Sequence, residues 1–169
     1  DTMPEILAEN PAHLRIIGRG RSRQRKALLK QARKLGLEDH ISVEPPVPHH
    51  EIANVIMRAD MCVAPLGYND RNVTQGCCPI KVIEYMGARK PIVAANLPVV
   101  RELVREDVDA LLFTPEDKHD LARQILRLLK DPQLADRLAN SAAERAIRRL
   151  TWRASQKRLL DIYSRLLSD

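Results

Sequence analysis

The sequence predicts an α/β domain whose core is a doubly wound, mostly parallel sheet. The chain has 169 residues, about the length of one domain. Short β-branched runs alternate with longer amphipathic segments, which is the pattern of βαβ crossovers. Apolar residues make up 44% and charged residues 30% of the chain, so we expect neither a disordered segment nor a membrane-embedded protein.

Strands are expected where apolar runs are bounded by turn residues, and helices where apolar residues recur at helical spacing. The predicted strands are residues 14–18, 41–43, 60–65, 91–95 and 110–113. The predicted helices are residues 22–36, 49–59, 79–88, 98–105, and the chain after 113, with breaks near Pro132 and Thr151. The first residues are expected to end a helix (Ile6, Leu7, Ala8), and residues 66–78 to form a long loop.

Ligands of doubly wound sheets bind at the carboxyl ends of the strands, in the loops that lead into helices. In this sequence the rule selects residues 18–22, 44–48 and 66–79. These three loops are the candidate site.

Basic charge is concentrated in one segment. Residues 14–37 hold nine lysines and arginines and no acid, in a chain of net charge +6. From Ser22 on, this segment is predicted as a helix with an apolar stripe and bases on its other faces. The charge fits a solvated helix face, a surface for phosphate or acidic lipid, or nucleic acid. Nucleic acid is disfavoured because the segment lacks the aromatic side chains on which bases stack.

The start of the helix predicted over residues 79–88 holds the groups best suited to bind a ligand. Pro79 is expected at the first helical position, where its missing N–H costs nothing. The amides of Ile80 and Lys81 would then point out of a helix start that favours anions. Glu84 lies on the same face as Lys81 and suits hydrogen bonds from a ribose diol. These residues fit a nucleoside-diphosphate site, or an ordinary amphipathic helix with a Lys–Glu surface pair.

The motifs of this segment continue along the chain. Residues 79–94 read PIKVIEYMGARKPIVA, and residues 97–102 read LPVVRE. Further matching motifs lie at residues 15–20, 41–51, 59–65, 128–132 and 151–152. In this order they resemble the carboxy-terminal domain of family 4 (group 1) glycosyltransferases, which are retaining enzymes of the two-domain GT-B fold. The resemblance covers nearly the whole chain.

The resemblance implies a Rossmann-like domain over residues 1–150 that binds a nucleoside-diphosphate sugar, and a crossover helix over residues 151–169. Glu84 would hold the ribose hydroxyls, Val47 would meet the base through its backbone, and Gly18 would belong to the Gly-rich turn at the donor. The residues offered to the diphosphate would be Gly76, Cys77, Cys78, Ile80 and Lys81. We assign no catalytic residue in this chain, because the acceptor site and the general base are expected from the other domain.

No cofactor and no metal are expected. His49 and His50 are adjacent and cannot both face one ion from a helix, and the spacing of Cys77 and Cys78 fits neither a zinc site nor an easy disulfide. Cys62 is expected in the core. Three cysteines, with no recognisable signal segment, predict a cytoplasmic location, at the membrane periphery if the basic segment meets lipid.

Two departures from the family stand out. The family usually has a second glutamate eight residues before the ribose-binding one, where this chain has Gly76; Gln75 or Asp70 could take over its contact with the donor sugar. Family members also begin this domain with a strand and a loop whose Arg and Lys clamp the diphosphate. This chain lacks them, together with the amino-terminal acceptor domain.

The missing strand is central in the usual doubly wound order. Its loss predicts two sheet halves with unpaired edges. We therefore expect the chain to be a fragment that is inactive alone, unless another copy or chain supplies the strand. The apolar face of its last helix predicts self-association of the fragment (Leu159, Ile162, Tyr163, Leu166).

Three functions compete at this point. The first is the donor-binding half of a glycosyltransferase. The second is a non-catalytic relative that keeps the fold as a nucleotide-binding or interaction module, which Gly76 and the missing clamp favour. The third is a basic module that binds anionic lipid or nucleic acid through residues 19–34.

Overall fold

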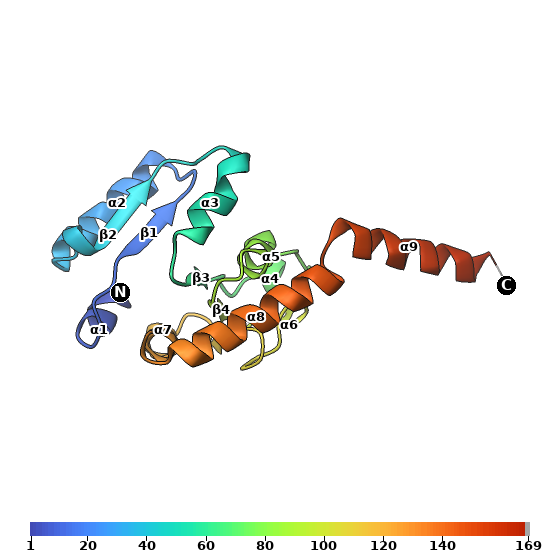
Figure 1. The fold of residues 1–169 in the computed structure, drawn as a ribbon. Helices are drawn as coiled ribbons and strands as arrows, with labels where there is room; N and C mark the ends of the chain where they lie inside the picture. The colour runs from blue at the N-terminus through green and yellow to red at the C-terminus, as the bar shows by residue number, and fades with distance from the viewer. Residues whose placement is uncertain (168–169) are drawn as a thin grey trace.

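The computed structural model describes residues 1–167 and contains two parallel sheets flanked by helices (Figure 1). One sheet pairs β1 (Leu14–Ile17) with β2 (Ile41–Glu44), and Leu14 lies opposite Ile41. The other has the order β3-β4-β5, formed by Cys62–Ala64, Ile92–Ala95 and Leu111–Phe113. The predicted α/β class with parallel strands is confirmed. The two predicted sheet halves are confirmed as well, because within residues 1–167 β1 pairs only with β2, and β3 only with β4.

The helices follow the predicted order with shorter bounds. They are α1 (Met3–Leu7), α2 (Ser22–Lys34), α3 (Ile52–Met57), α4 (Asp70–Val73), α5 (Ile80–Gly87), α6 (Pro98–Arg101), α7 (Lys118–Lys130), α8 (Pro132–Arg149) and α9 (Trp152–Leu166). Two 3₁₀ turns, η1 (Glu38–His40) and η2 (His49–Glu51), precede β2 and α3. The expected helix over residues 49–59 thus begins as a 3₁₀ turn. The expected loop over residues 66–78 contains the short helix α4, which sequence reasoning missed.

The main core surrounds β4, whose four residues are all fully buried. Val82 and Met86 of α5 and Leu138 and Ala142 of α8 pack into the same cluster, so α5 is fixed between the sheet and α8. A second, smaller cluster joins α1 and α2 to α7. Its buried residues are Met3, Ile6, Ala32, Leu37, Ala122 and Leu126. Cys62 is buried as expected.

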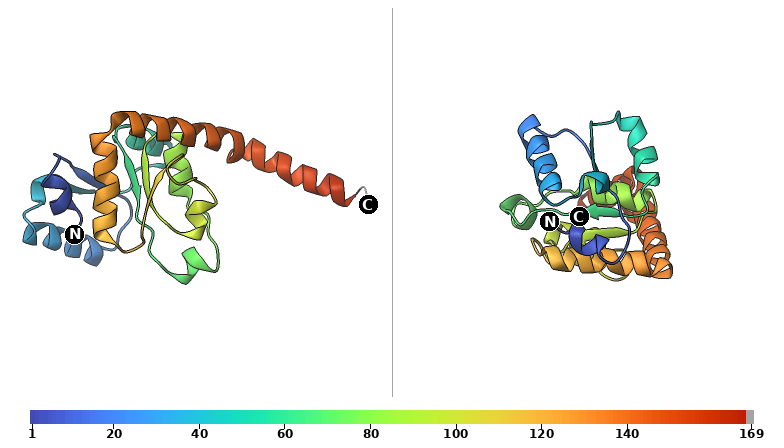
Figure 2. Two further views of the ribbon diagram at one scale, coloured as in Figure 1. Left: turned by 90° about the horizontal axis from the view of Figure 1, so that it is seen from below. Right: turned by 90° about the vertical axis from the view of Figure 1, so that its left-hand side faces the viewer.

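The last helix extends away from the body of the molecule (Figures 1 and 2). None of the residues of α9, all of which are described, is buried. Its expected apolar face is exposed, with Leu159, Ile162, Tyr163 and Leu166 each more than half accessible to solvent. The expected domain boundary at residue 150 and the self-association of this face stay predictions, and residues 168–169 of the expected crossover helix lie outside the described residues. None of the helices within residues 1–167 combines the length and the apolarity needed to cross a membrane.

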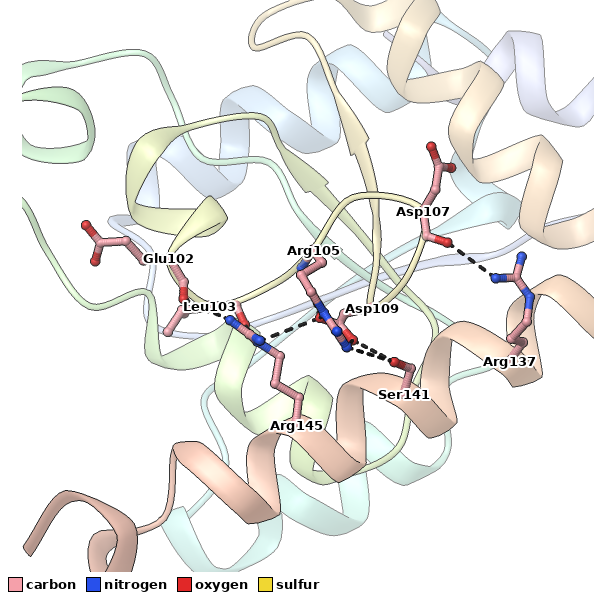
Figure 3. Close-up of polar contacts among 8 residues, drawn as sticks. All are labelled: Glu102, Leu103, Arg105, Asp107, Asp109, Arg137, Ser141 and Arg145. Atoms are coloured by element: carbon pink, nitrogen blue, oxygen red, sulfur yellow. Dashed lines mark hydrogen bonds and ion pairs between the residues drawn. The ribbon is translucent and has the colours of Figure 1, made fainter. Parts of the chain in front are cut away.

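A buried ion-pair cluster ties the turn before β5 to α8 (Figure 3). Asp109 is fully buried and accepts hydrogen bonds from Nε and Nη2 of Arg105 at 2.8 and 2.9 Å. It also accepts from the Ser141 hydroxyl at 2.7 Å and from the Arg105 amide at 3.0 Å. Arg145 lies 3.7 Å from the same carboxylate and donates to the Leu103 carbonyl. The helix predicted over residues 98–105 ends at Arg101, and the chain then folds back around Asp109.

Candidate functional site

A cavity of about 810 Å³ lies between the two sheets. Its walls include residues of the β1 edge (Leu14, Arg15, Ile17) and of the β3 edge (Cys62, Val63). Side chains from α1, α3 and α7 add further apolar lining. The edges of β1 and β3 that have no strand partner in the described part of the chain therefore face one shared, mostly apolar space.

Three of the predicted site residues line this cavity together. Gly18 follows β1, Val47 follows β2, and Lys81 stands in the first turn of α5. Gly18 and Val47 belong to two of the three loops that the rule for parallel sheets selects, and Lys81 lies two residues beyond the end of the third loop. The other predicted residues, from Gly76 to Ile80 and Glu84, do not line the cavity wall.

The start of α5 differs from the prediction by one residue. Pro79 is the N-cap, with φ −76° and ψ 77°, and the helix begins at Ile80. The Ile80 amide donates to the Cys78 carbonyl at 2.9 Å, so the expectation that it points out of the helix start was wrong. Among the described residues the Lys81 amide has no acceptor. One free amide, at Lys81, therefore accompanies the Lys81 ammonium in this first turn.

Lys81 and Glu84 form an ion pair, with 2.9 Å between Nζ and Oε2. The Glu84 side chain is 23% exposed and the Lys81 side chain 62%. The residues predicted to hold ribose and diphosphate are thus partners of each other in this structure. Lys81 can leave this pair at low cost, because an exposed ion pair of this kind is worth only about 0.5 kcal/mol.

The loop between β3 and α5 is held by two asparagines. Asn69 caps α4 by accepting from the Asn72 amide, and the buried Asn72 side chain donates to the Gly67 carbonyl at 2.8 Å. Asn72 also accepts from the Cys77 thiol at 3.2 Å. Gly76 has φ +75°, a left-handed conformation that side chains disfavour. The half-buried Cys77 is anchored in this way, whereas Cys78 is exposed.

The family of the chain follows from a match over most of its length. The family model described as glycosyl transferases group 1 matches residues 2–145. The chain belongs to the group 1 glycosyl transferases.

Curated relatives of this glycosyl transferase chain are considerably longer. It is 33% identical over 147 residues to a D-inositol 3-phosphate glycosyltransferase from Thermomonospora curvata, a match that covers 87% of this chain and 32% of the relative. An alpha-D-kanosaminyltransferase from Streptomyces kanamyceticus is 26% identical over 128 residues, covering 76% and 31% of the two chains. The chain therefore spans about a third of the length of these relatives.

Solved structures support the same fold for the glycosyl transferase chain. Sucrose-phosphate synthase from Thermosynechococcus elongatus superposes with a TM-score of 0.81 at 23% identity, covering 99% of this chain and 42% of that one. HepE from Anabaena in complex with UDP and glucose gives a TM-score of 0.79 at 22% identity, covering 96% and 44%. The expected Rossmann-like half of a GT-B fold is confirmed at the level of the fold.

Two titratable groups in the cavity of this glycosyl transferase domain stay neutral. Burial raises the pKa of the Cys62 thiol to about 11. Burial, with further contributions from Cys62 and Glu84, raises the pKa of Tyr85 to about 12. Both residues line the cavity, so at neutral pH its formal charge comes from other side chains, among them Lys81 and Arg19.

Two further residues of the glycosyl transferase domain line the cavity: Arg19, which lies in a predicted loop but was not assigned to the donor, and Tyr85, which sequence reasoning missed. Arg19 stands between the two glycines of the turn after β1, exposed and without an ion pair among the described residues. Its position between Gly18 and Gly20, directly after a strand, was the available signal. Tyr85 follows Glu84 on α5 and closes the wall next to Cys62. Nothing in its sequence context distinguishes it from a core residue.

Residues 1–167 of the glycosyl transferase domain hold no group of three or more His, Cys, Asp or Glu side chains placed to bind a metal ion. His50 instead lies 3.7 Å from the neighbouring Glu51. The expectation that the site works without a metal stays a prediction.

Proposed function

We propose that the chain binds the nucleoside-diphosphate part of a sugar donor for a retaining glycosyltransferase. The observation that carries the proposal is the meeting of Gly18, Val47 and Lys81 at one cavity, at the carboxyl ends of β1 and β2 and the start of α5. Membership of the group 1 glycosyl transferases supports it. So does the fold shared with HepE, which has been solved with UDP and with UDP-glucose.

In the proposed complex Glu84 accepts hydrogen bonds from the ribose hydroxyls, and Val47 meets the base through its backbone. The diphosphate lies against the loop over residues 76–80 and the first turn of α5. There the Lys81 ammonium exchanges its contact with Glu84 for a phosphate oxygen, and the free Lys81 amide donates to the same group.

The chemistry proposed for these groups is stabilisation of the departing diphosphate. Negative charge develops on the diphosphate oxygen as the sugar leaves, and a fixed cation and a helix start lower the energy of that state. Arg19 lines the same cavity, forms no ion pair with any acid in residues 1–167, and adds positive charge. This role needs no cofactor. Transfer to an acceptor requires the remainder of the enzyme, so the isolated chain is proposed to bind the donor and not to turn it over.

Binding of UDP, GDP and ADP by calorimetry tests the proposal. We expect one of them to bind, and Glu84→Gln to weaken that binding about tenfold to a hundredfold, because charged hydrogen bonds to the ribose are lost. The 2′,3′-dideoxy analogue of the same nucleotide should bind the unmodified chain as weakly as the variant binds the parent nucleotide. The variant should no longer distinguish the two ligands.

Glu144→Gln is the matched control, since Glu144 is exposed on α8 and outside the cavity. It should bind the nucleotide normally. Failure of all three nucleoside diphosphates to bind would contradict the proposal. If Glu84→Gln preferred the parent nucleotide over its dideoxy analogue by the same factor as the unmodified chain does, Glu84 would not be the residue that binds the ribose.

Gly76 favours a second candidate, a nucleotide-binding module without catalysis, because no side chain stands where the family usually has its sugar-contacting glutamate. Donor hydrolysis by the full-length protein separates the two functions. Hydrolysis that Glu84→Gln abolishes supports the transferase, and nucleotide binding without hydrolysis or transfer supports the module.

A further inference from the structure

Helix α2 carries a row of unopposed positive charge. Five of its bases lie within an arc of about 100° when the helix is viewed along its axis, and they form a line about 17 Å long. We call this line the basic stripe, and its residues are Arg23, Lys26, Lys30, Arg33 and Lys34. All five are exposed, whereas Ala32 on the opposite face of the helix is buried. The stripe therefore faces solvent.

None of the five stripe residues forms an ion pair with an acid among the described residues. Helix α7 is different, because its Arg123, Arg127 and Lys130 pair with Asp120, Asp107 and Glu9. Residues 14–37 contain no acid at all, so the helix offers its own bases no partner.

This arrangement works against the stability of the helix. Lys26, Lys30 and Lys34 follow one another at spacings of four residues, where like charges repel. The first turn has Arg23 and no acid, although the positive end of the helix dipole favours acids there. Only Arg33 and Lys34, in the last turn, suit the dipole. A charge pattern that costs helix stability is explained if it meets an anionic partner.

We propose that the basic stripe docks this domain on the surface of an anionic phospholipid bilayer. A straight row of exposed lysines and arginines suits a plane of phosphate headgroups, which attracts each base separately. Single-stranded nucleic acid fits less well, since residues 14–37 include no aromatic side chain for base stacking. Helix α2 lies at the periphery of the described residues, at the end away from α9, so no other element of residues 1–167 covers the stripe (Figures 1 and 2).

Docking through this surface is independent of nucleotide binding. The five stripe residues do not line the cavity between the sheets, so a bilayer can contact them without touching the proposed donor site. An enzyme held in this way would act on acceptors at or near the membrane surface.

Sedimentation of the chain with vesicles tests the proposal. We expect the chain to bind vesicles of equal parts phosphatidylglycerol and phosphatidylcholine, to ignore vesicles of phosphatidylcholine alone, and to be released as salt is raised. The double variant Lys26→Gln/Lys30→Gln should bind the anionic vesicles about thirtyfold more weakly, at about fivefold for each base. Its thermal midpoint should stay the same or rise, since like-charge repulsion in α2 is relieved.

The matched control is Lys118→Gln/Lys157→Gln, which removes the same charge from exposed lysines of α7 and α9. It should bind anionic vesicles within about twofold of the unmodified chain, because its lysines lie off the stripe. Equal weakening by the two double variants would show that net charge alone matters and would overturn the proposal. Tight binding of single-stranded RNA without binding to anionic vesicles would overturn it as well. Neither result affects the nucleotide experiment.

Discussion

Replacing Asp109 by asparagine is expected to lower the free energy of unfolding by about 3 kcal/mol, measured by urea denaturation at neutral pH. Asp109 is fully buried and accepts from Arg105, from Ser141 and from a backbone amide. An asparagine carries no charge, and its amide group places two donors where the carboxylate accepted. The turn before β5 would therefore lose the hydrogen bond and the ion pair that join Asp109 to α8.

The effect of Asp109→Asn on the free energy of unfolding should also depend on pH. Burial by itself would raise the pKa of Asp109, but the hydrogen bonds from Arg105 and Ser141 outweigh it and hold the pKa below its usual value. A carboxyl group whose pKa is lowered in the folded state stabilises the fold above its unfolded pKa, and this stability is lost as the pH falls through the folded value. The difference in the free energy of unfolding between the unmodified chain and Asp109→Asn should therefore be constant above about pH 5 and shrink below about pH 4.

Asp107→Asn is the matched control. Asp107 lies two residues earlier, with a side chain that is 60% exposed and an ion pair to Arg127 at 3.2 Å. Exposed pairs of this kind contribute little, so the change should stay within about 0.5 kcal/mol. Equal effects at the two positions would mean that the buried cluster does not anchor the turn.

Replacing Met86 by alanine is expected to destabilise the domain by about 3 kcal/mol, through lost burial and the cavity that is left. Met86 is fully buried on the face of α5 that packs into the main core, against the sheet and α8. The same helix carries Lys81 and Glu84 on its accessible side. Packing at Met86 therefore holds the proposed donor-binding groups in place. Thermal or urea unfolding gives the measurement.

Met57→Ala removes the same atoms from a methionine that is 53% exposed at the end of α3. Its effect should be below about 0.5 kcal/mol, since little apolar area leaves the interior. A loss at Met86 no larger than the loss at Met57 would contradict the packing assigned to α5.

Much of the fold could be predicted because its signals are local. The strands are short apolar runs between turn residues, and each predicted run overlaps an observed strand, with β2 extending one residue beyond its predicted end. The split into two sheets was also predictable, since a doubly wound order without its central strand leaves two edges. The meeting of Gly18 and Val47 followed from the rule that places ligand sites at the carboxyl ends of parallel strands, and Lys81 was predicted from the start of the helix that follows the third loop.

What sequence reasoning missed depends on contacts between distant segments. Asp107 and Asp109 stand in the same acidic turn, and both lie near Arg105. The residues of α8 that bury Asp109 could not be assigned, because Ser141 and Arg145 lie more than thirty residues away. The position of Pro79 was wrong by one residue because the Ile80 amide closes a tight turn with Cys78. The pairing of Lys81 with Glu84 was foreseen only as the surface-pair alternative to a nucleotide site.

The two apolar clusters imply that the domain does not have one uniform stability. The β1–β2 sheet has no buried residue, whereas every residue of β4 is fully buried. Elements with few buried contacts open at lower free energy than the core they adjoin. Amide hydrogens of β1 and β2 should therefore exchange with solvent well before those of β4. A ligand bound between Gly18, Val47 and Lys81 would contact both sheets, so the β1–β2 sheet could then open only together with the β3-β4-β5 part. Such a ligand would slow amide exchange mainly in β1 and β2.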